Sequence, residues 1–329
     1  MKLTRRQFAA SIGASAVAVA APAIGQEKYP SKPIRILVPY SPGGATDYAA
    51  RLISEKARQT LGVNIIIDNK PGAQGRLSLE ELGRAKPDGY TLMIGNVTTN
   101  CITPVLFGKQ LTFNYDKDVA AVARLMITPN VLLVTHEGFT PRTFKDTIEH
   151  IKKNPGKIRY GSSGIASFPH YDSELLARRL GLDMIHVPYK GGAGEMVKGI
   201  VSGEIQLTLL STPITLPQVQ AGKVTVISNV LQRLPQFADV PTLAEQGVKD
   251  VGTDNWSGVF APSGIPPEVI AMLYKAYTDA ANDKAVVEAA AKTGSFIWTA
   301  NSVEETRNWL QSELKKWRAI TDEVKVEMN

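Results

Sequence analysis

The chain has 329 residues, of which 21% are charged and 43% hydrophobic, fractions typical of a globular protein longer than one ordinary domain, so we expect two lobes. The formal net charge of +6 falls to +3 (6 − 3) without the N-terminal cations Lys2, Arg5 and Arg6, and so small a balance argues against a nucleic-acid partner. The single cysteine, Cys101, excludes an internal disulfide, a CxxC redox centre and a cysteine metal cluster.

The first 25 residues have the pattern of an export signal. The three cations precede a small, apolar run over residues 8–23 that is too short to span a bilayer comfortably. The sequence TRRQF resembles a twin-arginine signal, and small residues at 21–25 offer a cleavage site. We expect a mature protein that is free in the periplasm. An ordinary amphipathic first helix is the alternative.

A strand, a glycine turn and a helix are predicted between Ile34 and Leu61. The run IRILVPY is followed by SPGGAT, and apolar residues then recur at helical spacing. Gly43 and Gly44 permit close backbone approach, and Thr46 or Asp47 can cap the helix. The N–H groups of such a loop favour an anion.

Alternating strands and helices continue through the first lobe. Strands are predicted at 63–67 and 91–95, a helix at 77–85, and further strands at 119–125 and 131–134, with an irregular segment at 104–118. This alternation favours parallel βαβ units, in which ligands lie beyond the carboxyl ends of the strands. The sequence after the 91–95 strand, with Asn96, Thr98 and Thr99, is one such position.

The second lobe repeats the opening pattern. A strand at 157–160 leads into the loop GSSGIAS and a helix from about Pro169. Further strands are predicted at 183–189, 205–210 and 223–230, with a helix at 195–202, and 256–260 returns the chain to the first lobe. An amphipathic C-terminal helix is expected to pack there. The predicted division is 26–130 with 255–329 as lobe 1, and 131–254 as lobe 2.

Three kinds of chemistry are disfavoured by spacing. The loop SPGGAT is neither GxGxxG nor a phosphate loop, because no lysine follows its glycines. The sequence Gly161-Ser162-Ser163-Gly164 is not the GxSxG of a hydrolase, and nearby His170 is better explained as a capping or pocket-wall residue. The four histidines show no HxH or HExxH spacing. We expect no enzyme activity, no metal and no cofactor.

The remaining hypothesis is a clamp for a small anion. Two lobes, each with a Gly/Ser loop at a helix N-terminus, can close on a carboxylate and neutralise it mainly with backbone N–H groups. Hydroxyl groups and aromatic rings would complete the pocket. The hydroxyl candidates are Ser41, Thr46, Thr98, Thr99, Ser163 and Ser167, and the wall candidates are Tyr40, Phe168 and Tyr189.

Several ordered motifs resemble the Bug family, the periplasmic receptors of tripartite tricarboxylate transporters. They are YPSKPIRILVPYSPGGATDYAARLI, VNIIIDNKPGAQG, KPDGYTLMIG, YGSSGIASFPHYDSELLARRLGLDMIHVPYKGG and FADVPTLAEQGV, spread over the mature chain. The resemblance implies an α/β two-lobed Venus-flytrap fold, type II-like, with the ligand cleft between lobes. It also implies that Gly43–Thr46 and Ser163–Ser167 grip a carboxylate and that Asn96–Thr99 helps to set its identity.

The resemblance and the pattern together give a set of candidate ligand-binding residues. They are Tyr40, Ser41, Gly43, Gly44, Ala45, Thr46, Asp47, Asn96, Thr98, Ser163, Gly164, Ile165, Ala166, Ser167, His170, Tyr189 and Ser211. The chain departs from the family at Gln74-Gly75-Arg76, at Gly194-Glu195 and at Leu210, where many members have an aspartate. The loss of that carboxylate favours an organic acid, a di- or tricarboxylate or an aromatic acid, over an amino acid.

The expected partners follow from the resemblance. We expect a monomer that delivers its ligand to membrane transporter subunits, with a hinge near 131–134 and 256–260. The alternatives are a ligand-sensing receptor for a signalling kinase and a serine hydrolase that uses the GSSG loop.

Overall fold

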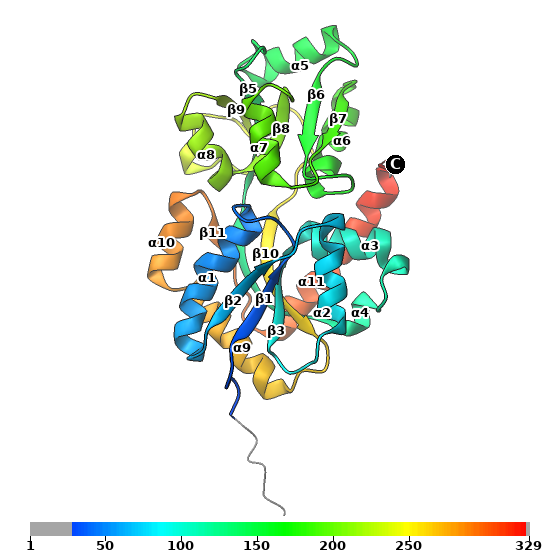
Figure 1. The fold of residues 1–329 in the computed structure, drawn as a ribbon. Helices are drawn as coiled ribbons and strands as arrows, with labels where there is room; N and C mark the ends of the chain where they lie inside the picture. Colours follow the sequence, from blue (N-terminus) through cyan, green and yellow to red (C-terminus); the bar gives the residue numbers. More distant parts are fainter. Residues whose placement is uncertain (1–27, 327–329) are drawn as a thin grey trace, which may run out of the picture.

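A computed structural model describes residues 28–326, which form two β-sheets flanked by helices (Figure 1). The predicted export signal lies outside these residues. We call the two parts the six-stranded half and the five-stranded half, after their sheets. The strand orders are β11-β4-β10-β3-β1-β2 and β7-β6-β8-β5-β9.

The six-stranded half contains both ends of the described chain. Its strands are β1 (Ile34–Val38), β2 (Ile65–Asn69), β3 (Thr91–Asn96), β4 (Val119–Thr128), β10 (Asn255–Pro262) and β11 (Phe296–Ile297). Its helices are α1 (Ala45–Leu61), α2 (Arg76–Arg84), α3 (Thr103–Phe107), α4 (Tyr115–Asp118), α9 (Pro267–Ala281), α10 (Lys284–Lys292) and α11 (Val303–Glu323).

The five-stranded half is built from the middle of the chain. Its strands are β5 (Asn130–Thr135), β6 (Arg159–Ser162), β7 (Ile185–Pro188), β8 (Leu207–Ser211) and β9 (Val224–Asn229). Its helices are α5 (Phe144–Lys153), α6 (Phe168–Leu180), α7 (Ala193–Val201) and α8 (Thr212–Gln220). The sequence pattern predicted most of these elements but gave no sign of α8.

Both sheets are mixed, whereas the alternating pattern favoured parallel units throughout. Strand β1 pairs parallel with β2 and β3, and β6 pairs parallel with β7 and β8, as expected. However, β10 is antiparallel to β3 and β4, and β5 is antiparallel to β8 and β9. Strands β5 and β10 enter their sheets from the other half of the molecule, so they run in the opposite direction. The short edge strand β11 is also antiparallel, to β4, within the six-stranded half.

The chain passes between the halves at Pro129, between β4 and β5, and again just before β10. The two crossings are tied together, because Asn130 Nδ2 donates a hydrogen bond to the carbonyl oxygen of Thr253 at 3.2 Å. The hinge expected at 131–134 and 256–260 falls inside β5 and β10, next to these crossings. The exact lobe boundaries stay a prediction.

The strand, turn and helix at 34–61 form as predicted. Helix α1 begins after Gly44, and Ala49, Ile53, Ala57 and Leu61 bury one of its faces in the core of the six-stranded half. Gly62 ends the helix in the left-handed region, with φ of 70°, a conformation that glycine adopts without steric cost.

The segment expected to be irregular is largely helical. Residues 98–102 form a π-helical turn, and α3 and α4 follow within the 104–118 stretch. The π-helical turn is buried, because Val97, Cys101 and Ile102 pack into the hydrophobic core. The sequence did not show this packing, because the turn is too short to display a helical period.

Helix α11 contacts both halves. Leu310, Leu314 and Trp317 are buried, and the helix packs against β4 as expected. Its C-terminal end also reaches towards α6 (Figure 1). The rings of Trp317 and Tyr171 meet there edge to face, with centroids 5.8 Å apart. The expectation that this helix packs on lobe 1 alone was therefore incomplete.

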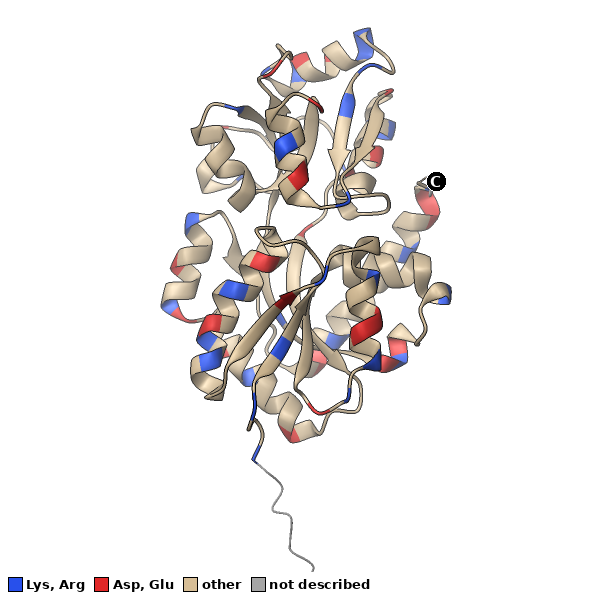
Figure 2. Ribbon diagram, viewed as in Figure 1, with Lys and Arg blue, Asp and Glu red and all other residues tan. Residues whose placement is uncertain are grey.

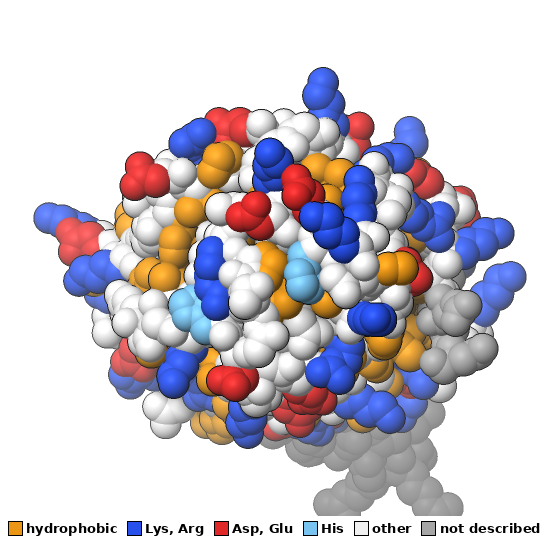
Figure 3. Space-filling view, turned by 90° about the horizontal axis from the view of Figure 1, so that it is seen from above, with side chains coloured by type: hydrophobic (Ala, Val, Ile, Leu, Met, Phe, Trp, Pro, Cys, Tyr) orange, Lys and Arg blue, Asp and Glu red, His pale blue; other side chains and the backbone are white. Residues whose placement is uncertain are grey.

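Charged side chains are distributed over both halves (Figure 2). The end view onto the five-stranded half shows basic and acidic side chains interspersed (Figure 3). No helix among residues 28–326 combines the length and the apolar character needed to cross a bilayer.

Candidate functional site

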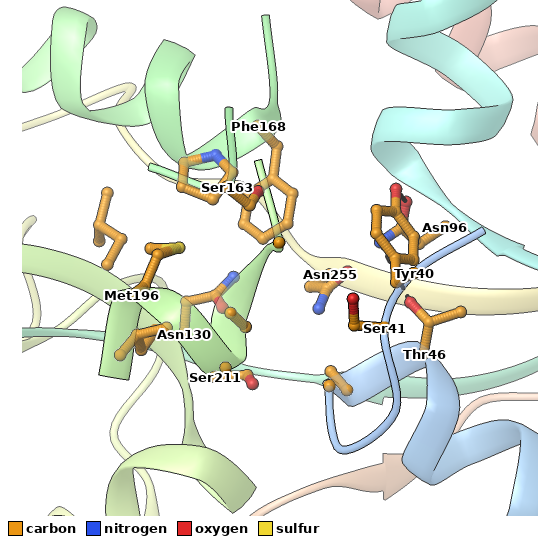
Figure 4. A pocket seen from close by; sticks show the side chains of 18 residues that line it. Tyr40, Ser41, Thr46, Asn96, Asn130, Ser163, Phe168, Met196, Ser211 and Asn255 are labelled. Carbon is orange, nitrogen blue, oxygen red and sulfur yellow. Dashed lines mark hydrogen bonds between the residues drawn. The ribbon is translucent and has the colours of Figure 1, made fainter. Parts of the chain in front are cut away.

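A cavity of about 60 Å³ lies between the two halves (Figure 4). It has room for several water molecules or a small ligand group. Both halves line it, at the ends of β1, β3, β6 and β8 and beside the two crossings. Its 18 lining residues are Tyr40, Ser41, Gly44, Ala45, Thr46, Asn96, Asn130, Ser163, Phe168, Pro169, Gly191, Ala193, Gly194, Met196, Leu209, Leu210, Ser211 and Asn255.

Four helices begin at this cavity. Gly44, Ala45 and Thr46 open α1, Phe168 and Pro169 open α6, Ala193 and Gly194 open α7, and Ser211 precedes α8. Helix N-termini carry partial positive charge and unpaired N–H groups. None of the 18 lining residues is Lys, Arg, His, Asp or Glu. The electrostatic character of the site therefore comes mainly from backbone dipoles, which favour an anion.

Asp47 holds the first loop in shape. Its Oδ2 accepts hydrogen bonds from Gly43 N and from Arg51 Nε, both at 2.9 Å, and its Oδ1 accepts one from Asn69 Nδ2 at 2.9 Å. Burial alone would raise the pKa of Asp47, but these hydrogen bonds outweigh it and hold the pKa below its usual value. Gly43, with φ of 89°, provides the turn. Asp47 and Gly43 do not line the cavity, so direct ligand contact by either stays a prediction.

A hydrogen-bond network fixes the polar wall of the six-stranded half. The Tyr40 hydroxyl donates to Asn96 Oδ1 at 2.7 Å and pairs with Thr99 Oγ1 at 2.7 Å. Asn96 Nδ2 in turn donates to Thr46 Oγ1 at 3.2 Å. Burial raises the pKa of Tyr40 to about 12, so it remains a neutral phenol. Tyr40, Thr46 and Asn96 were predicted site residues, and all three line the cavity.

The second loop uses several of its polar groups internally. Gly164 N donates to Ser162 Oγ at 3.2 Å, Ser167 Oγ donates to the Gly164 carbonyl at 2.7 Å, and Ala166 N donates to His170 Nδ1 at 3.1 Å. Of the expected stretch 163–167, only Ser163 lines the cavity. Gly164, Ile165, Ala166 and Ser167 instead shape the turn, and ligand contacts for them stay predictions.

Two histidines are stacked behind the second loop. The ring centroids of His170 and His186 lie 3.8 Å apart with the planes at 12°, and the Tyr160 ring stacks with His186 at 5.0 Å. Burial lowers the pKa of both histidines to about 4, with the neighbouring imidazole adding to the effect on His186. Neither residue lines the cavity, so the structure supports a loop-bracing position for His170.

The hydrolase alternative depended on Ser163. In the structure, His186 Nε2 lies 2.6 Å from the hydroxyl of Ser162 instead, and Ser162 is completely buried. No hydrogen bond joins Ser163 to a histidine within residues 28–326. The arrangement of a nucleophile and its base at the cavity, which this alternative needs, is not present in that part of the chain.

Two other predicted residues lie away from the cavity. Thr98 Oγ1 accepts a hydrogen bond from Phe168 N at 3.2 Å, so it joins the two halves beside the site. Tyr189 packs against Gly199 behind the wall of the five-stranded half. Ser41, Gly44, Ala45 and Ser211 do line the cavity, as predicted.

Asn130, Asn255, Met196 and Leu209 are lining residues that the sequence analysis missed. The two asparagines lie at the two crossings, and their amide groups reach the cavity (Figure 4). The only available signal was their position next to predicted strand ends. Met196 and Leu209 look like ordinary core residues in the sequence, and only the fold exposes part of them to the cavity.

Residues 49–326 match the family model described as the tripartite tricarboxylate transporter family receptor. The chain belongs to this receptor family. This confirms the resemblance inferred from the motifs. A UPF0065 protein of Bordetella pertussis is 32% identical over 95% of this chain and 96% of its own length, and protein BugT of the same organism is 27% identical over 98% of each chain.

Solved structures confirm the two-lobed periplasmic-binding-protein fold of this receptor. A structure described as a periplasmic transporter is 36% identical, with a TM-score of 0.86, covering 92% of this chain and 100% of its own. MatC from Rhodopseudomonas palustris, solved with bound malate, is 29% identical, with a TM-score of 0.81 and coverage of 89% and 99%. An R. palustris protein solved with adipate is 25% identical, with a TM-score of 0.85 and coverage of 91% and 99%.

Proposed function

We propose that the protein is a periplasmic receptor that binds a small organic carboxylate between its two halves and delivers it to a tripartite tricarboxylate-type membrane transporter. Family membership supports the receptor role, and the adipate and malate bound to two similar proteins support the ligand class. No turnover of the ligand is part of the proposal.

The convergence of four helix N-termini on a cavity without charged side chains carries the proposal. A carboxylate can accept several N–H hydrogen bonds there and gains from the helix dipoles. The positive ends of the same dipoles would repel a cation. The Ser41, Thr46 and Ser163 hydroxyl groups can add directional hydrogen bonds to the ligand.

The proposal also covers how the protein reaches its site and works there. A twin-arginine signal in residues 1–25 would direct export, and the mature chain would act as a monomer. The two halves would form lobes 26–130 with 255–329 and 131–254, rotating about the crossings at Pro129 and Thr253 to admit the ligand.

A ligand panel tests the proposal. Purified mature protein is titrated with aliphatic and aromatic mono-, di- and tricarboxylates, and with amines, sugars and nucleotides, while thermal unfolding is followed. A true ligand at about a hundredfold excess over its dissociation constant should stabilise the fold by roughly 3 kcal/mol. Stabilisation by amines, sugars or nucleotides alone would contradict the proposal.

A further inference from the structure

Asn130 is a buried amide at the first crossing, and it lines the cavity (Figure 4). It is the first residue of β5 and is only 4% exposed. Its Nδ2 donates a hydrogen bond to the carbonyl oxygen of Thr253 at 3.2 Å. The reverse orientation of the amide would bring two acceptor oxygen atoms together, so this bond fixes the orientation. Asn130 Oδ1 is the atom that is left for other contacts.

Asn130 Oδ1 receives no hydrogen bond from any group within residues 28–326. The atom is not sealed inside the protein, so a molecule in the cavity can reach it. The hydroxyl groups of Ser163 and Ser211 and the amide of Asn255 also line the cavity, but none of them donates to this oxygen. An amide oxygen can only accept, and a buried acceptor without a donor is unfavourable. This position therefore requires a donor from the ligand.

The wall of the six-stranded half, in contrast, is arranged to donate. Thr46 Oγ1 accepts a hydrogen bond from Asn96 Nδ2 at 3.2 Å, so the hydroxyl proton of Thr46 is free for the ligand. Together with the N–H groups at the start of α1, this hydroxyl can hold a carboxylate. A carboxylate has no proton to offer, so it satisfies these donors but not Asn130 Oδ1. The ligand needs a second group that donates.

The cavity favours an uncharged donor over an ammonium group. None of its 18 lining residues is Asp or Glu, so an ammonium group would have no counter-charge there. The positive ends of the four helices that begin at the cavity would also repel it. A buried cation without a partner is costly, whereas a hydroxyl group donates a hydrogen bond without carrying charge.

We infer that the ligand is a hydroxy acid, whose hydroxyl group donates to Asn130 Oδ1 while its carboxylate lies at the helix N-termini. This inference rests on the proposed carboxylate-binding function. An acid without the hydroxyl group leaves Asn130 Oδ1 to a trapped water molecule or to no partner. Asn130 is then a specificity-determining residue, and it reads the ligand at the point where the two halves are joined.

Matched pairs of ligands test the inference on the unmodified protein. Calorimetric titration compares propionate with lactate, succinate with malate, and phenylpropionate with phenyllactate, using each enantiomer of the hydroxy acid. In every pair that binds, the better enantiomer is expected to bind at least tenfold more tightly than the acid without the hydroxyl group. A preference below threefold in every such pair would overturn the inference and leave the proposed function standing. Binding by no carboxylate of the wider panel would overturn both.

Amino acids test whether the donor is uncharged. Alanine, aspartate and phenylalanine carry an ammonium group where lactate, malate and phenyllactate carry the hydroxyl group. Each should bind at least tenfold more weakly than its hydroxy acid. Tighter binding of an amino acid would overturn the hydroxy-acid assignment, because the site would then accept a cation.

Two variants of Asn130 test whether its oxygen is the acceptor. Asn130→Leu removes the acceptor, whereas Asn130→Asp keeps an acceptor oxygen. Neither leucine nor an ionised aspartate can donate to the Thr253 carbonyl, so the loss of that bond is common to both variants. In Asn130→Leu, the preference for the hydroxy acid should fall to threefold or less. In Asn130→Asp, the added charge should weaken every carboxylate, but the tenfold preference should remain.

Thermal unfolding of each variant establishes that it is folded. A folded Asn130→Leu that kept the preference would show that the hydroxyl group lies elsewhere. If Asn130→Asp lost the preference as Asn130→Leu does, the preference would depend on the bond to Thr253, and the assignment of Asn130 Oδ1 would be wrong. The ligand pairs decide the inference on the unmodified protein if a variant does not fold.

Discussion

The main-chain N–H of Phe168, at the start of α6, donates a hydrogen bond to Thr98 Oγ1 across the junction of the two halves, at 3.2 Å. Thr98 belongs to the π-helical turn of the six-stranded half, and its side chain is buried. Phe168 also lines the cavity, whereas Thr98 does not, so this contact joins the halves at the edge of the site. We expect it to link ligand binding to closure.

Removal of this acceptor should weaken binding without damage to the fold. Thr98→Val leaves the Phe168 N–H without a partner in the closed arrangement, at a cost of about 1 kcal/mol. The dissociation constant should rise roughly fivefold, chiefly through faster release. Thr215→Val is a matched control, since Thr215 is buried with no partner for its hydroxyl. Unchanged affinity in Thr98→Val would show that this contact does not limit closure.

The N–H of Gly44 should be essential for the ligand. Gly44 has φ of −79°, which proline can adopt, so Gly44→Pro removes the N–H with little strain. Titration should show at least a tenfold loss of affinity with unchanged melting temperature in the absence of ligand. Gly44→Ala keeps the N–H, and its added methyl group would lie 3.9 Å from the nearest atom, the Ser41 carbonyl oxygen. The Gly44→Ala variant should therefore bind the ligand with nearly unchanged affinity. A similar loss of affinity in both variants would contradict a contact between the ligand and the Gly44 N–H.

Asp172 should make stability fall as pH rises. Burial raises its pKa from 3.8 to about 7, although the hydrogen bond from Thr253 Oγ1 and the charge of Lys316 oppose the shift, and Asp254 reinforces it. Between these pH values the unfolded chain releases a proton that the folded protein retains, so stability is lost with rising pH by at most about 1.4 kcal/mol per unit. Asp172→Asn should remove this contribution, measured as free energy of unfolding against pH. An unchanged profile would show that Asp172 is ionised in the fold.

The stacked histidines should make the fold more stable as pH rises, the opposite of the effect of Asp172. His170 and His186 have pKa values lowered from 6.5 to about 4 by burial, so the unfolded chain binds protons that the folded protein does not. Their contribution to stability is present above pH 6.5 and is lost as pH falls towards 4. Two imidazole signals in NMR spectra should titrate near pH 4. Midpoints near 6.5 for both rings would contradict their burial in a closed loop.

The sequence was most informative where a local pattern decides the structure. The run 34–61 predicted a strand, a glycine turn and a helix, and all three are present. Several ordered motifs also indicated the family and its fold. The sequence could not reveal that β5 and β10 run antiparallel to their neighbours, because the direction of each strand depends on the half that it enters. It also could not reveal the π-helical turn at 98–102, whose burial comes from packing with α11.

For the site, sequence reasoning identified one wall better than the other. Tyr40, Ser41, Thr46 and Asn96 follow directly from strand ends in the six-stranded half. In the second loop, the Gly164 and Ala166 N–H groups looked available but are bound by Ser162 and His170. A glycine-rich loop indicates where donors can point; only the folded neighbours decide whether those donors remain free.

The position of α11 has a consequence for the path of the ligand. Its contact with α6 and the two crossings join the halves along one side, with the ring pair Trp317 and Tyr171 at its end. Helices α1, α8 and α10 lie on the opposite side (Figure 1). An apolar groove of about 770 Å³ lies between them and shares Gly44 with the cavity. The two halves are therefore joined along the side formed by α11 and the crossings. We expect a solute to enter and leave the cavity on the opposite side, past Gly44.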